Sequence, residues 1–263
     1  MLTNFVQRFT EGRTNYRPAG EPINTRLYEV AEIREAEAKA FVVRHHYSGS
    51  YPAARRRFGL FRGPNLVGVA VFSHPCNDKT ITNVFRCENA TDGLELGRFV
   101  LTDEVPANGE TWFLARCREK LRREFVGVVS FSDDTPRTLA DGTVRFAGHI
   151  GTIYQASNAA FLGRGTARSL RLLPDGLVLS DRAIQKIRSG DRGCDYSADI
   201  LCSYGAKAPP EGDFERREWL SYWLRILTRT IKHPGNLKYA WSFSKAVRLE
   251  SLAYPKFGRV CNV

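Results

Sequence analysis

The chain has 263 residues, of which 43% are hydrophobic and 25% are charged. This is an ordinary globular composition, with enough apolar side chains for a sizeable core. Its 39 Lys and Arg outnumber its 28 Asp and Glu, which gives a net charge of +11. Because arginine forks suit phosphates and base edges, the charge favours a nucleic-acid partner over a basic protein without a polyanion.

The six cysteines show no CxxC pair and no other paired spacing. A zinc ribbon and a disulfide scaffold are therefore not expected. The first twenty residues lack the apolar run of a signal peptide, and no apolar stretch of about 18 residues follows. We therefore expect no membrane partner and a reducing cytoplasm as the compartment.

In chain order, residues 1–25 are polar and interrupted by Gly and Pro, which predicts a loose N-terminal arm. "EVAEIREAEAKAFVV" predicts a helix that ends near Val42, with "RHHYSGS" as the following loop. Two apolar runs about a Gly-Pro-Asn turn predict a hairpin in "RRFGLFRGPNLVGVAVFS". "ELGRFVLTDEV" predicts a strand. The apolar spacing of "NGETWFLARCREKLRREF" then predicts a helix, with Asn108 as its cap.

In the second half, "GVVSFSDD" predicts a buried strand and "GHIGTIYQASN" a helix. A Pro-Asp-Gly turn predicts a hairpin in "RSLRLLPDGLVLS". A short helix should follow, with Ser180 as its cap and Gly190 as its stop. A long amphipathic helix should then run from about residue 213 to Pro234-Gly235, with Trp219 and Trp223 in the core. This order predicts an α/β or α+β sheet with helices packed on it.

Tyr154 is the first candidate for chemistry. In a helix, Tyr154 and Asn158 would share a face and could point at one bound molecule. Ser130 and Asp133 lie at the end of the preceding strand, where reactive groups commonly collect in such sheets. A tyrosine there can donate a proton, because its phenol stays protonated at neutral pH. The alternative is a buried tyrosine whose hydroxyl only bonds to the backbone.

The segment "RHHYSGSYPAARRR" is the second candidate. His46 and Tyr47 could ligate an iron-type metal, although adjacent histidines cannot both ligate easily and other ligands must come from elsewhere. An ordinary loop is the alternative. The run of Arg55, Arg56 and Arg57 favours contact with a polyanion, or else forms a solvated strand face.

The C-terminal segment is the third candidate. Residues 214–263 hold ten Lys and Arg against three Glu, with aromatic residues between them. This mixture suits phosphate contact and base stacking. We therefore predict DNA contacts for residues of the non-periodic stretch "KHPGNLKYAWSFSK", namely Lys238, Tyr239, Trp241 and Lys245.

These motifs together resemble one family. "ELGRFVL", "NGETWFLARCREKLR", "GVVSFSDD" and above all "GHIGTIYQASN" are similar to the Mom DNA-modification family of Mu-like phages and prophages. The likeness runs from about Arg44 to about Lys245. It implies a GNAT-like acyltransferase fold, with a central mixed sheet flanked by helices in residues 26–212. Residues 213–263 would form a basic, aromatic C-terminal extension packed on that domain.

The resemblance also implies an activity. The family converts the N6 amine of adenine in double-stranded DNA into a carbamoylmethyl-amine, which protects phage DNA from host restriction. On this basis Tyr154, Asp133 and Ser130 line the reaction centre. His46 and Tyr47 correspond to the family's suspected metal-linked pair, for which iron has been proposed. The compartment would be the cytoplasm of an infected or prophage-carrying bacterium.

The donor of the transferred group stays open. Arg98 would neighbour the donor on its strand, and Asn158 would contact it. The phosphate loop of ordinary GNAT enzymes is degraded here to "TDEVPANGET", which puts acyl-CoA in doubt. A glycyl donor such as an aminoacyl-tRNA is the alternative, and a basic surface would suit it too.

Adenine inside a duplex cannot present its N6 to a buried site, so the base must be flipped out. The N6 amine is a poor nucleophile, so either a base or a strongly activated donor is required, and Asp133 is the candidate base. Two other functions remain open from the sequence. One is a GNAT enzyme that acts on a protein amine or an aminoacyl-tRNA. The other is a catalytically inactive GNAT-fold protein that only binds DNA.

Overall fold

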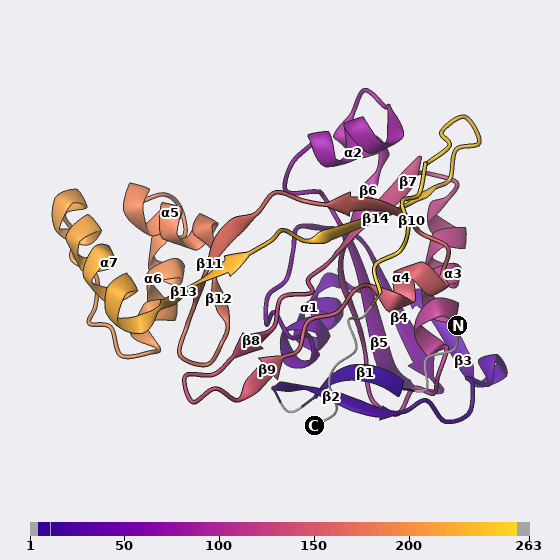
Figure 1. Cartoon of the computed structure of the whole chain (residues 1–263), viewed down its shortest axis with the longest axis horizontal. Helices are drawn as coiled ribbons and strands as arrows, with labels where there is room; N and C mark the ends of the chain where they lie inside the picture. The colour runs from indigo at the N-terminus through magenta and orange to yellow at the C-terminus, as the bar shows by residue number, and fades with distance from the viewer. Residues whose placement is uncertain (1–4, 11, 257–263) are drawn as a thin grey trace. The chain divides into compact units, whose positions relative to one another are not determined.

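The computed structural model describes residues 5–10 and 12–256. They divide into two compact units (Figure 1). The first unit takes its described residues from Met1–Thr135, Ala147–Gly165 and Gly235–Val263, and the second consists of Pro136–Phe146 and Thr166–Pro234. The predicted segment 213–263 is therefore shared between the two units, and its residues 257–263 lie outside the described part of the chain.

A seven-stranded sheet forms the centre of the first unit, in the order β10-β14-β7-β6-β5-β4-β3. β6 and β7 are parallel, and the other neighbours are antiparallel. The sheet is thus mixed, as expected. Its strands are β3 (Tyr28–Glu32), β4 (Ala54–Arg62), β5 (Asn65–Ser73), β6 (Leu94–Leu101), β7 (Gly127–Ser132), β10 (Ala160–Arg164) and β14 (Leu237–Ser242).

Helices cover both faces of this sheet. Alternate residues of a strand point to opposite faces, so Val128 and Trp241 pack with α3 and α4, whereas Val129 and Ala240 pack with α2. α1 packs on β5 and β6 through a separate apolar cluster. The helical segments are η1 (Thr25–Leu27), α1 (Glu35–His45), α2 (Lys79–Phe85), η2 (Ala90–Asp92), α3 (Gly109–Leu121) and α4 (Thr152–Ala156).

The two parallel strands separate part-way along the sheet. β6 pairs with β7 only from Leu94 to Leu96, opposite Val128 to Ser130. Beyond that point β6 stays paired with β5 as far as Leu101, while β7 stays paired with β14 as far as Ser132. A gap therefore opens between β6 and β7 beyond Leu96 and Ser130, at the carboxyl ends of both strands.

The second unit is a smaller α+β body with its own apolar core, which includes Ile187, Leu201 and Leu220. Its three-stranded antiparallel sheet has the order β12-β11-β13, and β8 pairs with β9. Its elements are β8 (Arg137–Thr138), β9 (Val144–Phe146), β11 (Arg168–Leu172), β12 (Val178–Leu179), α5 (Asp181–Ser189), α6 (Cys194–Cys202), α7 (Asp213–Leu227) and β13 (Arg229–His233).

The N-terminal residues form a docked hairpin rather than only a loose arm. β1 (Phe5–Thr10) pairs with β2 (Arg13–Pro18). Gln7 Nε2 donates to the Gly148 carbonyl oxygen at 2.9 Å, and the buried Arg8 forms an ion pair with Glu110. Hydrogen bonds and one ion pair hold this hairpin to the unit. A sequence pattern does not reveal such contacts, so the polar composition alone predicted a loose segment.

Three local predictions are wrong. Residues 28–32 form β3, so the helix begins only at Glu35, and it continues past Val42 to His45. α7 ends at Leu227, because Arg229–His233 pairs with β11. Asn108 has a left-handed backbone with φ 65° and makes no side-chain capping bond.

Other predictions are confirmed. The β4–β5 and β11–β12 hairpins form about the expected turns. Ser180 caps α5 by accepting from the Ala183 N–H, and Gly190 ends it in the left-handed conformation. Trp219 and Trp223 pack against the core of the second unit. The α+β class with a central mixed sheet is confirmed. No helix among the described residues is long and apolar enough to cross a membrane.

Candidate active site

Two glycines bring α4 against the sheet. Gly148 has φ 78°, and a Cβ there would lie 2.7 Å from the Asp134 backbone. Gly151 has φ 72°, and a Cβ there would lie 2.8 Å from the ring of Tyr239. Both the positive φ angles and the close approach favour glycine. The glycines thus let the loop pass the end of β7 and set Tyr154 on the sheet.

Asn158 does not share a helix face with Tyr154. α4 ends at Ala156, and Asn158 is exposed with a left-handed φ of 59°. Asparagine tolerates this conformation better than most residues, so its place is explained by the turn that leads into β10. The prediction that Tyr154 and Asn158 point at one molecule is wrong. The contact predicted between Asn158 and the donor has no support from this geometry.

Tyr154 is buried where β6 and β7 separate. Its ring packs edge-on against Trp241, with centroids 5.7 Å apart, and against Tyr239 at 5.5 Å. Burial raises the pKa of the Tyr154 phenol, and the neighbouring Ser130 hydroxyl opposes part of that rise. The Ser130 hydroxyl is the hydrogen-bond partner of the phenol, and no backbone partner of the phenol is found among the described residues. Tyr154 is therefore a protonated phenol that is not committed to the backbone, which favours the proton-donor interpretation.

Glu95 is a site residue that the sequence analysis missed. It lies on β6 beside the gap, and burial raises the pKa of its carboxyl group, against the effect of the Arg98 charge. Its negative charge also contributes to the raised pKa of Tyr154, so the two groups are within electrostatic range. The available signal was one acidic residue inside the apolar strand "LELGRFVL". We call Glu95, Arg98, Ser130 and Tyr154 the gap site.

Arg98 is fixed at the gap. Its Nε donates to the Ser50 carbonyl oxygen at 2.8 Å and its Nη2 to the Ser50 hydroxyl at 2.7 Å. Burial lowers the pKa of Arg98, while the negative charges of Tyr47 and Glu95 would raise it. The predicted neighbours Arg98, Tyr47, Ser130 and Tyr154 are therefore brought together. Arg98 ties the loop that follows α1 to the sheet.

His46 and Tyr47 lie in that loop, with ring centroids 4.2 Å apart. The ring of Tyr47 is 6.4 Å from that of His149, and His149 is 6.4 Å from Tyr154. An aromatic row thus connects the loop to the gap site. The Ser48 N–H donates to His46 Nδ1 at 3.2 Å, so in the neutral ring Nε2 carries the proton.

Within residues 5–10 and 12–256, no group of three or more His, Cys, Asp or Glu side chains could hold a metal ion. Iron ligation by His46 and Tyr47 stays a prediction, and we assign no reaction step to iron.

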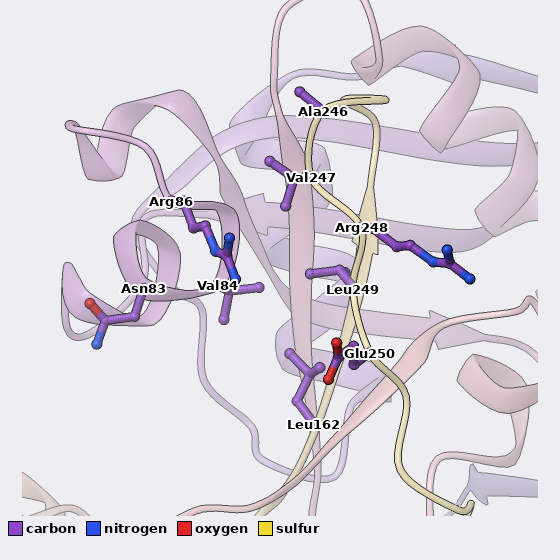
Figure 2. A pocket seen from close by; sticks show the side chains of 9 residues that line it. All are labelled: Asn83, Val84, Arg86, Leu162, Ala246, Val247, Arg248, Leu249 and Glu250. Atoms are coloured by element: carbon purple, nitrogen blue, oxygen red, sulfur yellow. The ribbon is translucent and has the colours of Figure 1, made fainter.

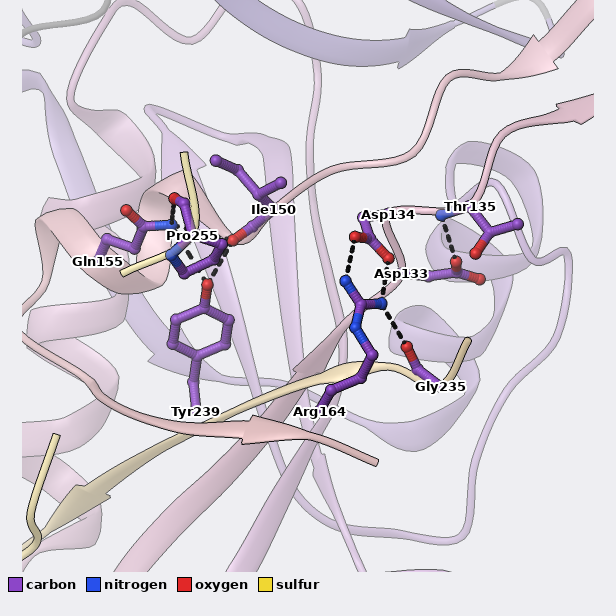
Figure 3. Close-up of polar contacts among 9 residues, drawn as sticks. All are labelled: Asp133, Asp134, Thr135, Ile150, Gln155, Arg164, Gly235, Tyr239 and Pro255. Atoms are coloured by element: carbon purple, nitrogen blue, oxygen red, sulfur yellow. Dashed lines mark hydrogen bonds and ion pairs between the residues drawn. The ribbon is translucent and has the colours of Figure 1, made fainter. Parts of the chain in front are cut away.

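Asp133 is buried next to the gap site, and its carboxylate accepts from the Thr135 N–H at 2.9 Å. Its backbone oxygen accepts from the His149 N–H at 2.8 Å. The adjacent Asp134 forms a two-point ion pair with Arg164, at 2.7 and 2.8 Å (Figure 3). These contacts hold the turn after β7, and the role of Asp133 as a base stays a prediction.

The three arginines of β4 make contacts within the first unit. Arg55 donates to the Thr91 carbonyl oxygen at 2.7 Å and lies 5.0 Å from the centre of the Phe125 ring. Arg56 pairs with Glu124. Arg57 donates to the Ile33 carbonyl oxygen at 3.3 Å. All three are half-buried, so much of their charge is directed inward. DNA contact by this run stays a prediction.

Two of the predicted C-terminal DNA contacts need correction. Tyr239 and Trp241 are 0% and 5% exposed. The Tyr239 hydroxyl donates to the Ile150 carbonyl oxygen (Figure 3). The stretch lacks helical periodicity because it forms β14, a strand buried on both faces. Lys238 is half-buried and Lys245 is exposed, so only the lysines remain available for phosphate contact.

A separate pocket of about 310 Å³ lies between α2 and the segment that follows β14 (Figure 2). None of the predicted site residues lines it. Its polar side chains include Arg86 and Arg248, and its apolar wall includes Val84 and Leu249. The gap site remains the place where the candidate chemical groups meet.

The sequence profile of the Mom protein family matches residues 27–201. This segment includes every residue of the gap site. The chain belongs to the Mom protein family. The resemblance inferred from the motifs is therefore confirmed.

One relative in the Mom family is methylcarbamoylase mom of Escherichia phage Mu, which is 27% identical to this chain over 161 residues. The match covers 59% of this chain and 61% of that protein, less than two thirds of the relative's length. A tandem GNAT protein from the clavulanic acid biosynthesis pathway, without AcCoA, has a TM-score of 0.43 and 9% identity over 82% of this chain and 99% of that chain. A TM-score of this size is too low to argue a shared fold.

Proposed function

We propose that this member of the Mom family is a transferase that attaches a carbamoylmethyl group to the N6 amine of adenine in duplex DNA. In its phage or prophage setting the modification would protect DNA from host restriction. The observation that carries the proposal is the gap site itself. A buried, protonated Tyr154 lies beside Ser130 and within range of Glu95, inside the segment that matches the family.

The groups of the gap site suit the chemistry. The N6 lone pair is delocalised into the purine ring, so transfer needs a base to remove the proton of the amine. Glu95 is the base that we propose, because its raised pKa makes it a stronger base than a solvated carboxylate. Tyr154 would donate a proton to the leaving group of the donor. Asp133, whose carboxylate already accepts from the Thr135 N–H, is the second candidate base.

We propose only the chemical class of the donor, a molecule that carries phosphates. Coenzyme A thioesters and aminoacyl-tRNA both carry phosphates, which basic side chains bind. Acyl transfer from either would bond a carbonyl carbon to N6, so a further rearrangement is needed to reach the N6–CH2 bond of the carbamoylmethyl group. β6 and β7 do not pair with each other beyond Leu96 and Ser130, and Arg98 lies on β6 just past that point. We propose that the reactive end of the donor lies in this gap, opposite Tyr154.

A protein that only binds DNA would not need the gap site. The Ser130 hydroxyl is fully buried, and its neighbour there is the Tyr154 phenol rather than the backbone, and burying such polar groups is unfavourable. The half-buried Glu95, whose pKa is raised by desolvation, adds a second unfavourable group. These costs favour an enzyme over an inactive DNA-binding protein. Enzymes commonly keep catalytic groups in positions that lower the stability of the folded protein.

Mass analysis of nucleosides tests the proposal. The protein is expressed in bacteria that carry a reporter plasmid, and plasmid DNA is compared with DNA from cells that carry an empty vector. A deoxyadenosine heavier by one carbamoylmethyl group is the expected result. Unmodified deoxyadenosine in cells that contain the soluble protein would contradict the proposal.

A further inference from the structure

The β1–β2 hairpin presents one face made of mixed aromatic and polar side chains. Residues directly opposite each other in antiparallel strands point to the same face. Phe5 lies opposite Pro18, Gln7 opposite Tyr16, and Phe9 opposite Thr14. Phe5, Gln7, Phe9 and their partners therefore form one face.

This face touches the loops around the gap site. Gln7 donates to the Gly148 carbonyl oxygen at 2.9 Å, and the Thr14 hydroxyl accepts from the Ala147 N–H at 3.1 Å. The Phe9 ring meets Tyr47 edge-on, with centroids 6.1 Å apart. The hairpin is thus connected to the loop that carries His149 and to the aromatic row that leads to Tyr154.

The other face is fixed to the body of the first unit. Arg8 is 7% exposed, pairs with Glu110 and donates to the Val105 carbonyl oxygen at 3.3 Å. Arg17 donates to the same carbonyl oxygen at 2.6 Å. Burial lowers the pKa of Arg8 to about 10, so it stays charged at neutral pH. These contacts make the hairpin a fixed wall beside the gap site.

Two aromatic side chains on this wall are open to solvent. Phe5 is 59% exposed and Tyr16 is 55% exposed, the highest values for aromatic residues described in the first unit. Single exposed aromatics are common. These two share a face that leads to the gap site, and their exposure adds little to folding stability. The aromatics first predicted to stack with bases, Tyr239 and Trp241, are in the core.

We propose that this face of the hairpin is a wedge that enters duplex DNA beside the target adenine. Tyr16, supported by Phe5, would stack on the bases that the flipped adenine leaves behind. Inserted apolar side chains offset unstacking in this way, and each base–aromatic stack stabilises the complex by an amount comparable to the cost of flipping. The wedge rests on the proposed function.

Charge favours DNA as the occupant of this face. Arg13, next to the hairpin turn, is exposed and makes no ion pair with any residue that the structure describes. It can contact a phosphate on the strand that flanks the wedge. The net charge of +11 would hold the duplex against the protein without regard to sequence.

The test has two stages. Modified adenines are first mapped on a plasmid co-expressed with the wild-type protein. Duplexes are then made with 2-aminopurine at such a position, either paired with thymine or opposite an abasic site, and fluorescence is recorded with excess protein. This second stage needs no donor. The variants are Tyr16→Ala, Tyr16→Phe and Tyr196→Ala, and Tyr196 is an exposed aromatic of the second unit.

The wedge predicts a fluorescence rise with the wild-type protein, with Tyr16→Phe and with Tyr196→Ala. Tyr16→Ala should lose about tenfold in the ratio of flipped to stacked base on the paired duplex. It should regain most of the signal opposite the abasic site. An unchanged signal for Tyr16→Ala, or an equal loss on both duplexes, would overturn the wedge. A wild-type protein that modifies no plasmid adenine contradicts the proposed function itself.

Discussion

The two compact units differ in the hydrogen-bond partners of their buried polar side chains. Within the described residues, the first unit holds buried hydroxyls that have no backbone hydrogen bond, among them Ser130 beside the Tyr154 phenol and Ser132 beside the Tyr239 phenol. In the second unit the buried Ser197 donates to the Gly193 carbonyl oxygen at 2.9 Å. Arg216, which is also buried there, donates to the Ile187 carbonyl oxygen at 2.9 Å. These two buried side chains of the second unit are therefore satisfied by backbone partners.

This difference between the units agrees with the proposed active site in the first unit. In the first unit, Glu95, Ser130 and Tyr154 come together where β6 and β7 separate, while apolar clusters cover much of the rest of its sheet. Unsatisfied groups lower stability unless a ligand completes them. The comparison thus predicts that substitutions in the gap site change activity more than stability, and that those in the second unit do the reverse.

The largest expected effect is that of Glu95→Gln. Loss of the base should lower modification of a co-expressed plasmid about a hundredfold or more, whereas the exposed Glu29→Gln serves as a control with no effect. Nucleoside mass analysis measures both. Full activity of Glu95→Gln would contradict the role of Glu95 and leave Asp133 as the remaining base.

The same variant predicts a change in stability with pH. Burial raises the pKa of Glu95 above its ordinary value of 4.5, so the folded state holds this proton more tightly than the unfolded state does. Stability from this group is present below pH 4.5 and is lost as pH rises through the folded pKa. Glu95→Gln should therefore be at least as stable as the wild type at pH 7, as thermal unfolding at pH 4 and pH 7 would record.

Leu220→Ala tests the second unit. Leu220 is 2% exposed, and its truncation should lower the free energy of unfolding by about 2–5 kcal/mol. Ile226→Ala on the same helix is the matched control, because Ile226 is 51% exposed, and it should change stability by less than about 1 kcal/mol. Chemical denaturation measures both. Equal effects would contradict the assignment of the packed face of α7.

Gly151→Ala and Gly49→Ala form a second matched pair. Both glycines have positive φ, so alanine should cost about 1–2 kcal/mol at either position. Only at Gly151 would the new Cβ meet other atoms, the rings of Tyr239 and Tyr154. Gly151→Ala should therefore also reduce DNA modification, and Gly49→Ala should not. Equal activity of the two variants would show that the position of the loop around Gly151 does not affect DNA modification.

The smallest effect is expected for Ser132→Ala. Its buried hydroxyl has no backbone hydrogen bond and lies beside the Tyr239 hydroxyl, so its removal should change the free energy of unfolding by less than about 0.5 kcal/mol. Ser197→Ala removes a hydroxyl that is hydrogen-bonded and should lower it by about 0.5–1.5 kcal/mol. The opposite order in denaturation experiments would remove the contrast between the units.

Much of the fold could be predicted from local signals. Turn residues predicted two hairpins, and Ser180 with Gly190 marked both ends of α5, because these features depend on neighbouring residues alone. β3 and β13 were missed because their pairing comes from distant strands, β4 and β11. The division into two units was missed for the same reason: the second unit interrupts the first at two separate points of the sequence.

The candidate site could be predicted only in part. Tyr154, Ser130 and Arg98 were found because they stand next to strand ends or within quoted motifs. Glu95 was missed because its significance depends on where β6 and β7 separate, which no local pattern encodes. Tyr239 and Trp241 were misplaced because a strand buried on both faces has no periodicity to distinguish it from an exposed segment.

One measurement tests the central claim most directly. Plasmid DNA is co-expressed with the wild type, with Tyr154→Phe or with Tyr239→Phe, and the mass of deoxyadenosine is determined for each. Both variants remove one buried tyrosine hydroxyl, but only that of Tyr239 bonds to the backbone. We expect modification to disappear in Tyr154→Phe and to persist in Tyr239→Phe. Modified deoxyadenosine at the wild-type level in Tyr154→Phe would contradict the claim that the gap site carries the chemistry.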